Sequence, residues 1–358
     1  MTNRTGHFQF DQMKKKLLFF VLMLDALTGA AQQDIPVIET LDLAAAPAGQ
    51  VSRYWLHMIS NGLSQPVLVP VMVAKGVNPG PVLGLVAAIH GNELNGIPII
   101  QQLFQQIDPK QLNGTVVAVP GLNAAGILNE DRLFNDQEDL NRRFPGKENG
   151  DVSQQYVWRI FDKLVRHTDL LIDLHTASFG RVNTMYVRAD MDSDTLAAMA
   201  RLQGADIIVN NPGIPSAGAG SGDLTLRAFA ASRGIPGITV EYGDPQVYQP
   251  DMTARGLRGI QRTMAYLKMT QNPVAEPEKE AILCKKSYWL YTDEGGLLDV
   301  TVALGQSVAR GDVIGILRNP FGDVIRTYQA PESGVVIGKS SNPVNQSGGR
   351  ILHLGILK

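Results

Sequence analysis

The sequence predicts an α/β fold with a mixed, largely parallel sheet flanked by helices, followed by a small all-β domain at the C-terminus. First, between residues 82 and 269, short apolar runs of strand length alternate with segments of helical apolar spacing, the pattern of a mainly parallel sheet. Second, residues 282–358 contain only strand-like runs with glycines at intervals. Third, several strands of the first region end at histidine or glutamate, where α/β sheets present functional groups.

The composition is that of an ordinary globular protein and excludes some classes of function. The chain has 358 residues, of which 44% are hydrophobic and 18% are charged. Its 32 basic and 34 acidic residues give a net charge of -2, without the basic excess that a general nucleic-acid-binding protein needs. Cys284 is the only cysteine, so neither an intramolecular disulfide nor a thiolate zinc cluster can form.

Residues 1–33 have the pattern of a secretory signal peptide. A basic cluster at 13–16 precedes an apolar run at 17–24, and small residues lie before Gln32. Cleavage of this leader predicts a periplasmic or secreted protein, whereas its retention predicts a cytoplasmic one. The alternative is an amphipathic helix or a disordered arm, because a polar stretch precedes the basic cluster and Asp25 interrupts the apolar run. That run is too short for a stable membrane span.

The predicted catalytic domain covers residues 34–272. Apolar runs bounded by turn residues predict its strands, and apolar residues at helical spacing predict its helices. The expected strands lie at 35–70 (a set of antiparallel strands), 82–89, 115–119, 170–174, 183–188, 206–209 and 237–240. The expected helices lie at 97–107, 152–165, 196–202, in a short stretch ending at 232, and at 253–269.

Individual residues mark where these elements end. The first helix stops before Pro109, and the strand that follows it ends at Pro120, because proline cannot donate the next backbone hydrogen bond. A glycine-rich stretch at 218–222 superficially suggests a phosphate-binding loop. It lies well after its strand and has no P-loop lysine, so we interpret it as a loop bordering the site.

The end of the chain has a different composition. Pro, Glu and Lys accumulate at 273–281 and predict a linker, and residues 282–358 form the predicted small β domain. Its glycine spacing is similar to that of biotinyl/lipoyl-type β domains, but it has no Met-Lys-Met turn for a covalent carrier. We therefore interpret it as a lid or an assembly surface, which would be compatible with a homo-oligomer.

Metal-binding or acid-base residues follow three strands that are far apart in the sequence. His90 and Glu93 follow the strand 82–89, His175 follows 170–174, and Glu241 follows 237–240. Two histidines and a glutamate are a ligand set of catalytic zinc, with the fourth position left to water. A free carboxylate beside such a metal can take a proton from the water and pass it to a leaving nitrogen. Glu241 has the chemistry for that role.

Each of these residues has a simpler explanation when it is taken alone. A His-x-x-Glu pair such as His90 and Glu93 occurs by chance, a single histidine at a strand end is more often structural, and Glu241 could be an ion-pair partner. The convergence of all of them on the carboxyl ends of strands in one sheet is much harder to explain by chance. The combination therefore favours a metal site.

The polar segment between residues 123 and 150 supplies further candidates. Asn141 and Arg142 are adjacent and could hold a substrate carboxylate, because a guanidinium group binds both carboxylate oxygens. Arg132 could face the carbonyl oxygen on which negative charge develops. A solvated, salt-bridged loop is the alternative, but a neighbouring metal site favours substrate binding.

The motifs of the chain resemble those of the succinylglutamate desuccinylase/aspartoacylase family, within the zinc carboxypeptidase-like clan. The matching stretches are His90-Gly-Asn-Glu93, Asp139-Leu-Asn-Arg-Arg-Phe-Pro-Gly146, Asp173-Leu-His175 and Glu241-Tyr-Gly243. The resemblance covers about residues 80–245 and implies a zinc-dependent hydrolase of a linear amide with one Zn²⁺ per chain.

By the same motif match, His90, Glu93 and His175 are implied to be zinc ligands and Glu241 the catalytic carboxylate. Asn141 and Arg142 are implied to bind a substrate carboxylate, and Arg132 to polarise a carbonyl. The motifs do not specify the acyl group or the amino acid.

Three functions are compatible with these residues. The first is a zinc amidohydrolase acting on a small N-acyl amino acid or a related amide. The second is a zinc carboxypeptidase acting on peptides or, if the chain is exported, on cell-wall peptides. The third is a non-catalytic binding protein, which the presence of all the ligands, the base and the arginines disfavours.

Overall fold

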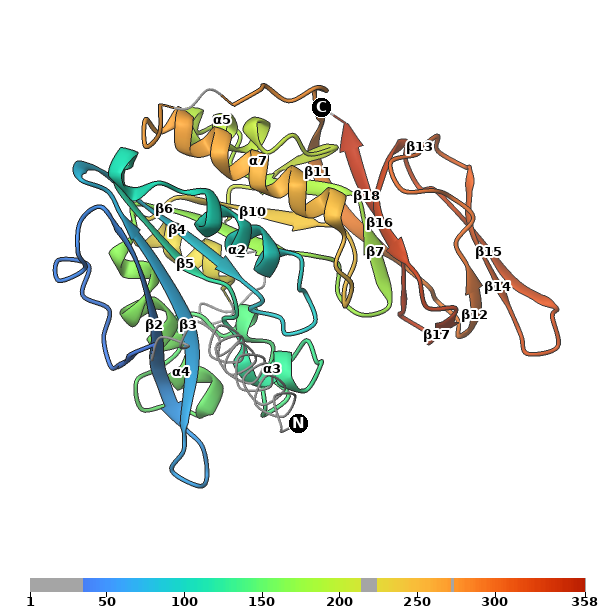
Figure 1. Ribbon diagram of the computed structural model, residues 1–358. Helices are drawn as coiled ribbons and strands as arrows, with labels where there is room; N and C mark the ends of the chain where they lie inside the picture. The colour runs from blue at the N-terminus through green and yellow to red at the C-terminus, as the bar shows by residue number, and fades with distance from the viewer. Residues whose placement is uncertain (1–34, 214–223, 272–273, 358) are drawn as a thin grey trace, which may run out of the picture. The chain divides into compact units, whose positions relative to one another are not determined.

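The computed structural model of the chain describes residues 35–213, 224–271 and 274–357 (Figure 1). The predicted leader at 1–33 and the glycine-rich loop at 218–222 lie outside the described residues. No helix in the described part combines the length and the apolar character that a membrane crossing requires.

The described residues form a main sheet of 14 strands. Its order is β1-β2-β3-β5-β4-β6-β10-β8-β9-β11-β18-β16-β13, with β7 beside β16. The strands are β1 (Val37–Ile38), β2 (Gln50–Ser60), β3 (Pro66–Lys75), β4 (Asn78–Ala87), β5 (Asn113–Val119), β6 (Leu170–His175), β7 (Arg181–Asn183), β8 (Met185–Ala189), β9 (Ile207–Asn210), β10 (Gly237–Tyr242), β11 (Ile282–Tyr291), β13 (Ser307–Val308), β16 (Gly334–Ser340) and β18 (Arg350–Leu357).

The four central strands of the sheet are parallel. Strand β4 pairs in parallel with both β5 and β6, and β6 pairs in parallel with β10. The register places Ala87 of β4 beside Leu174 of β6, and His175 of β6 beside Glu241 of β10. Because parallel strands end at the same edge of a sheet, the residues that follow β4, β6 and β10 meet there.

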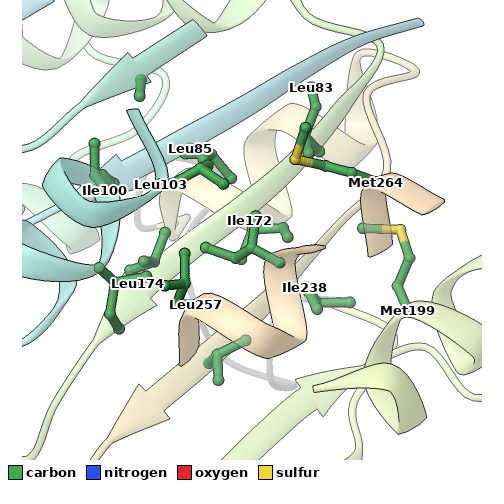
Figure 2. Packing of buried hydrophobic residues seen from close by; sticks show 14 of the residues in the cluster. Leu83, Leu85, Ile100, Leu103, Ile172, Leu174, Met199, Ile238, Leu257 and Met264 are labelled. Carbon is green, nitrogen blue, oxygen red and sulfur yellow. The ribbon is translucent and has the colours of Figure 1, made fainter. Parts of the chain in front are cut away.

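Helices cover both faces of this sheet, as the alternating apolar pattern predicted. The described helices are α2 (Gly96–Gln106), α3 (Ala124–Leu128), α4 (Val152–Lys163), α5 (Asp194–Leu202), α6 (Leu226–Ser232) and α7 (Pro250–Tyr266), with short 3-10 helices at Pro109–Gln111, Leu140–Arg142 and Val165–His167. Helices α2, α5 and α7 share one buried apolar cluster with the sheet, and α4 and α6 share another. Figure 2 shows part of the first cluster, which includes Ile172 of β6 and Leu257 of α7.

Local chemistry explains where the helices begin. Asp151 and Gln154 form a capping box at the start of α4, in which each side chain bonds to the backbone N–H of the other residue. Helix α7 begins at Pro250, three residues before the predicted start. Proline is favoured in the first turn, where its missing N–H would have no partner within the helix.

The predicted single strand at 183–188 is divided in the structure. Residues 181–183 form β7, which pairs with β16, whereas 185–189 form β8, which pairs with β9 and β10. Between them, the Thr184 N–H donates to the Ile337 carbonyl at 2.9 Å. The chain changes its hydrogen-bonding partner at this residue, and a local apolar pattern carries no information on the partner.

The C-terminal residues are all-β, as predicted, and they extend the main sheet. Strand β11 pairs in parallel with β9, and β18 and β16 follow in antiparallel order. A second sheet has the order β15-β14-β12-β17. Its strands are β12 (Gly296–Asp299), β14 (Val313–Arg318), β15 (Val324–Gln329) and β17 (Val344–Asn345). The domain boundaries at 272 and 282 stay a prediction.

Candidate metal centre and active site

The backbone after β4 directs the first candidate ligands toward the sheet edge. Ala88, just beyond the strand, has a φ of 58°, a left-handed conformation that is unfavourable for residues other than glycine. The turn is held in place because the N–H groups of Leu122 and Asn123 donate to the carbonyls of Ala87 and Ala88, both at 2.9 Å. His90 follows this turn and is buried.

The structure brings His90, Glu93 and His175 together. One nitrogen or oxygen atom from each of the three lies within 4.8 Å of the other two. Glu93 Oε1 is 2.9 Å from His90 Nδ1, and Glu93 Oε2 is 2.8 Å from His175 Nδ1. All three side chains are buried. The three predicted ligands therefore form one compact group, which could hold a metal ion.

The bonding of these atoms fits a cation between them. His90 Nδ1 is buried and makes no hydrogen bond in the described structure, although Glu93 Oε1 is only 2.9 Å away. A buried polar atom without a partner is costly, and a metal ion would satisfy it. Two imidazole nitrogens and a carboxylate are one of the ligand sets that zinc prefers.

Two aspartates contact the outer nitrogens of the histidines. Asp139 Oδ1 is 3.1 Å from His90 Nε2, and Asp173 Oδ2 is 3.0 Å from His175 Nε2. A carboxylate in this position orients a metal-binding histidine and makes it a stronger ligand. Sequence reasoning placed both aspartates in motifs but missed this role. For Asp173 a signal existed, because residues two apart on a strand point to the same face.

The charges in the group reinforce one another. Burial raises the pKa of Glu93, but His90 and His175 outweigh it and hold that pKa well below its usual range. Burial lowers the pKa of His175, yet Asp173 and Glu93 raise it well above the ordinary histidine value. The ionised Glu93 carboxylate thus provides the negative charge that a cation would require.

Arg132 lies beside the same group. Its Nη1 donates to Glu93 Oε1 and to Ser178 Oγ, both at 2.9 Å, and its Nη2 donates to Asp139 Oδ2 at 2.9 Å. Burial by itself would raise the pKa of the Asp139 carboxyl. The hydrogen bond with His90 and the charges of His90 and Arg132 outweigh burial and hold this pKa well below its usual range. Arg132 is therefore in the site, and its role toward a substrate carbonyl stays a prediction.

Glu241 lies in the same cavity and is held by two donors. Tyr186 Oη donates to Glu241 Oε1 and Asn183 Nδ2 donates to Glu241 Oε2, both at 3.2 Å. Burial and the nearby Glu93 charge raise the pKa of Glu241. A carboxyl with a raised pKa is a better proton acceptor, which is what a general base needs. Sequence reasoning missed the contact that Asn183 makes with Glu241.

Asn141 and Arg142 are on the short helix Leu140–Arg142. Asn141 Oδ1 accepts from the Leu226 N–H at 2.7 Å, and Arg142 Nη1 donates to the Asn141 carbonyl at 2.7 Å. The first bond fastens the segment to the start of α6 and leaves the Asn141 amide N–H groups for other partners. Both side chains line the cavity, and their binding of a substrate carboxylate stays a prediction.

The three candidate ligands line one cavity of about 720 Å³ together with Arg132, Asn141, Arg142 and Glu241. Its lining includes six arginines, which are Arg132, Arg142, Arg181, Arg188, Arg227 and Arg350. It also includes the carboxylates of Glu93, Asp139 and Glu241. Sequence reasoning missed Arg227, Arg350 and Trp289. The missed residues lie on elements whose position depends on tertiary packing, and no local motif marks them.

Comparison with known proteins supports the motif resemblance. The family model described as "Succinylglutamate desuccinylase/Aspartoacylase catalytic domain" matches residues 79–267, which is just over half of the chain. The chain is also similar to the N-alpha-acetyl-L-2,4-diaminobutyric acid deacetylase of Halomonas elongata. The two are 27% identical over 315 residues, covering 85% of this chain and 86% of the relative.

Solved structures share the fold. The product-bound ectoine utilization protein EutE (DoeB) from Ruegeria pomeroyi superposes with a TM-score of 0.79 at 21% identity, covering 90% of this chain and 100% of that one. A succinylglutamate desuccinylase/aspartoacylase from Rhodobacter sphaeroides superposes with a TM-score of 0.78 at 21% identity, covering 89% of this chain and 98% of that one. The mixed sheet with flanking helices is thus a fold that these proteins have in common.

Proposed function

Because the chain belongs to the succinylglutamate desuccinylase/aspartoacylase family, we propose that it is a zinc-dependent hydrolase that cleaves the amide bond of a small N-acyl amino acid. Family membership makes the chain an amide-cleaving enzyme. The observation that carries the finer proposal is the buried group His90, Glu93 and His175, placed in one cavity with the separate carboxylate Glu241.

The metal is proposed to be zinc, held by His90, Glu93 and His175. Support comes from the donor set, from the unpartnered His90 Nδ1, and from the outer carboxylates Asp139 and Asp173. Zinc bound there would supply Lewis acidity, which makes water a stronger nucleophile near neutral pH and polarises an amide carbonyl.

Glu241 is proposed to move the proton. Its carboxylate accepts a proton from the attacking water and then donates it to the amide nitrogen, so that the amine can leave. Tyr186 and Asn183 orient the two carboxylate oxygens. The raised pKa of Glu241 helps both steps, because the group must first accept the proton and later release it.

The arginine and asparagine side chains are proposed to hold the substrate. Arg142 and the amide of Asn141 would bind the carboxylate of the amino-acid part, with the start of α6 as the fixed support. Arg132 would stabilise the negative charge that develops on the carbonyl oxygen. Preorganised donors of this kind contribute most when water is excluded from the site, and Arg132 is already positioned by Glu93, Asp139 and Ser178.

The test is a substrate screen with zinc-loaded protein. N-acyl amino acids and short peptides are incubated separately, and the released amine is quantified. Release from N-acyl amino acids is expected. Activity on peptides alone would instead establish the carboxypeptidase alternative. Inactivity on both panels, combined with no zinc retained after dialysis, would favour a non-catalytic binding protein.

The Glu241→Gln variant tests the proton-transfer role. Glutamine keeps the shape of the side chain but cannot accept the proton, so kcat is expected to fall by about 10² to 10⁴-fold. Zinc content, measured by atomic absorption, should stay at one ion per chain. Glu148→Gln is the matched control, since Glu148 is exposed and does not line the cavity. Full activity of Glu241→Gln would show that the base is another residue.

A further inference from the structure

Strand β8 presents alternate side chains to the cavity beside the proposed base, Glu241. Every second residue of β8, beginning with Met185, belongs to the buried apolar cluster on one face of the sheet. The residues between them, Tyr186 and Arg188, point to the opposite face, because neighbouring residues of a strand alternate between the two faces. Both of these side chains line the cavity, as does Glu241.

The pairing of β8 with β10 brings Tyr186 and Arg188 to Glu241. Tyr186 lies directly opposite Glu241 in this antiparallel pair, and Arg188 lies opposite Thr239. Side chains of directly opposite residues lie close together on the same face of a sheet. Tyr186 Oη is 3.2 Å from Glu241 Oε1, and Arg188 Nη2 is 3.1 Å from Tyr186 Oη. The three groups therefore form a chain in which Tyr186 is the middle member.

The direction of each hydrogen bond in this chain follows from the chemistry of arginine. A guanidinium group donates hydrogen bonds but cannot accept them, and a tyrosine hydroxyl group has one hydrogen to donate. The Tyr186 oxygen must therefore accept from Arg188, which leaves its own hydrogen for Glu241. Burial raises the pKa of Tyr186, so the hydroxyl group keeps this hydrogen at neutral pH. The bond from the charged Arg188 also polarises the hydroxyl group and makes it a stronger donor.

The other contact of the Arg188 guanidinium group is also with Tyr186. Within the described part of the chain, the Arg188 side chain makes one hydrogen bond, which is the one to Tyr186. Its Cζ lies 5.2 Å from the centroid of the Tyr186 ring. Burial lowers the pKa of Arg188, but Tyr186 and Glu241 outweigh burial and raise it. Arg188 is thus directed at the tyrosine that holds Glu241.

We propose that Arg188 is a positioning residue that acts on Glu241 through the hydroxyl group of Tyr186. By donating to the tyrosine oxygen, Arg188 turns the hydroxyl hydrogen toward Glu241 Oε1. This fixes the carboxylate in the orientation in which it takes the proton from the attacking water. The inference rests on the proposed function, because it assigns Arg188 to the proton-transfer step of that reaction.

A double-mutant cycle tests whether Arg188 acts through the hydroxyl group. Arg188→Met removes the donor, whereas Tyr186→Phe removes only the hydroxyl group. Each single substitution is expected to lower kcat for an N-acyl amino acid about tenfold and to change KM by less than about twofold, because one orienting hydrogen bond is lost. In the Tyr186→Phe protein, Arg188→Met should lower kcat by less than about twofold.

The opposite outcome of the cycle is equally clear. Phenylalanine keeps the aromatic ring, so any effect of Arg188 on packing, or on the substrate directly, remains in the Tyr186→Phe protein. An equal loss of kcat in both backgrounds would therefore overturn the proposal. A loss that appears in KM alone would also overturn it, because it would show that Arg188 binds the substrate.

Two further variants separate positioning from a general effect of charge. Arg188→Lys keeps a cationic donor on a flexible chain and should recover part of the kcat that Arg188→Met loses. Arg201→Met removes the same charge from an exposed position that does not line the cavity, and it should leave kcat and KM unchanged. The same loss of kcat in Arg201→Met would overturn the assignment.

Nuclear magnetic resonance of the zinc-loaded full chain tests the hydrogen bond without relying on turnover. With isotope-labelled tyrosine, a slowly exchanging hydroxyl proton of Tyr186 is expected, and its loss in Tyr186→Phe assigns it. In Arg188→Met this proton should exchange with water at least about tenfold faster, because a hydrogen bond that holds the group is lost. Arg201→Met should not change it.

The resonance also distinguishes the two proposals from each other. If the wild type cleaves no N-acyl amino acid while the Tyr186 proton depends on Arg188, the proposed function fails and the positioning of Tyr186 by Arg188 stands. If the wild type is active while the proton is absent, or unchanged in Arg188→Met, the inference about Arg188 fails and the proposed function stands.

Discussion

Asp173 contacts one of the three candidate metal ligands without belonging to that group itself. It is almost fully buried on β6, and its carboxylate faces the outer nitrogen of His175 at 3.0 Å. Asp139 occupies the corresponding position beside His90 and is also held by Arg132. Both aspartates belong to the motifs that carried the family resemblance. In the motif Asp173-Leu-His175, the aspartate contacts the histidine of the same motif. In the motif that begins at Asp139, the aspartate contacts His90 instead.

We expect Asp173→Asn to weaken zinc binding by about 10 to 100-fold, the usual effect of losing a carboxylate that orients a histidine ligand. The amide keeps the volume of the side chain but not its charge, so His175 becomes a poorer ligand. Competition with a chromophoric chelator measures the affinity. Asp162→Asn is the control, because Asp162 pairs with Arg166 on the surface. Unchanged zinc affinity in Asp173→Asn would contradict an orienting role.

At the scale of elements, the first residue of α2 determines how closely this helix approaches the sheet. A Cβ atom at Gly96 would lie 2.7 Å from the Ala87 Cβ of β4 and 2.9 Å from the Leu174 Cβ of β6. Ala87 and Leu174 are paired in the sheet. The candidate metal ligands His90 and His175 follow them in the sequence. Gly96 is therefore required by the close packing of α2 against these two strands.

Gly96→Ala is expected to lower the free energy of unfolding by about 1–3 kcal/mol, the usual cost of overpacking a well-packed core. The neighbouring atoms are Cβ atoms of strands and cannot rotate away, so this cost exceeds the gain of about 1 kcal/mol from the higher helix propensity of alanine. Urea denaturation monitors the loss. Gly62→Ala, where nothing lies within 4 Å of the added Cβ, should change stability by about 0.5 kcal/mol at most.

At the scale of the whole molecule, aromatic contacts connect the C-terminal strands to the cavity. His353 on β18 stacks on Trp289 of β11 and meets the edge of Tyr186 of β8, which in turn donates to Glu241. Burial, followed by the charges of Arg188 and Arg181, holds the pKa of His353 well below the usual histidine value. The folded protein therefore keeps this histidine neutral at a pH where the unfolded chain would protonate it.

This buried histidine should make the fold less stable in acid. The contribution is fully present above the unfolded pKa of about 6.5 and is lost as the pH falls toward the lower folded pKa, because the unfolded state then binds the extra proton. The slope approaches about 1.4 kcal/mol per pH unit. Denaturant unfolding at several pH values measures it. His353→Gln, although less stable at neutral pH, should show a shallower slope; an identical slope would contradict this assignment.

Much of the catalytic part was predictable because it depends on short-range patterns. Apolar runs and helical spacing located most strands and helices, since the side chains that face a core repeat with the geometry of the element. His90, Glu93, His175 and Glu241 were identified because each follows directly after a buried strand, and parallel strands end at one edge. Their meeting in one cavity depended only on that general property of α/β sheets.

The remaining features arise from pairing between distant segments. Strand β11 continues the main sheet beside β9, and through this pairing Trp289 and Arg350 reach the cavity that β4, β6 and β10 form. The division of β7 from β8 has the same origin. Local patterns show which side chains must be buried. They do not show which strands pair, because the backbone groups that form the hydrogen bonds between strands are the same in nearly every residue. The strand beside which β11 pairs, and with it the part of the cavity that Trp289 and Arg350 line, is therefore specified by the packing of the complete chain.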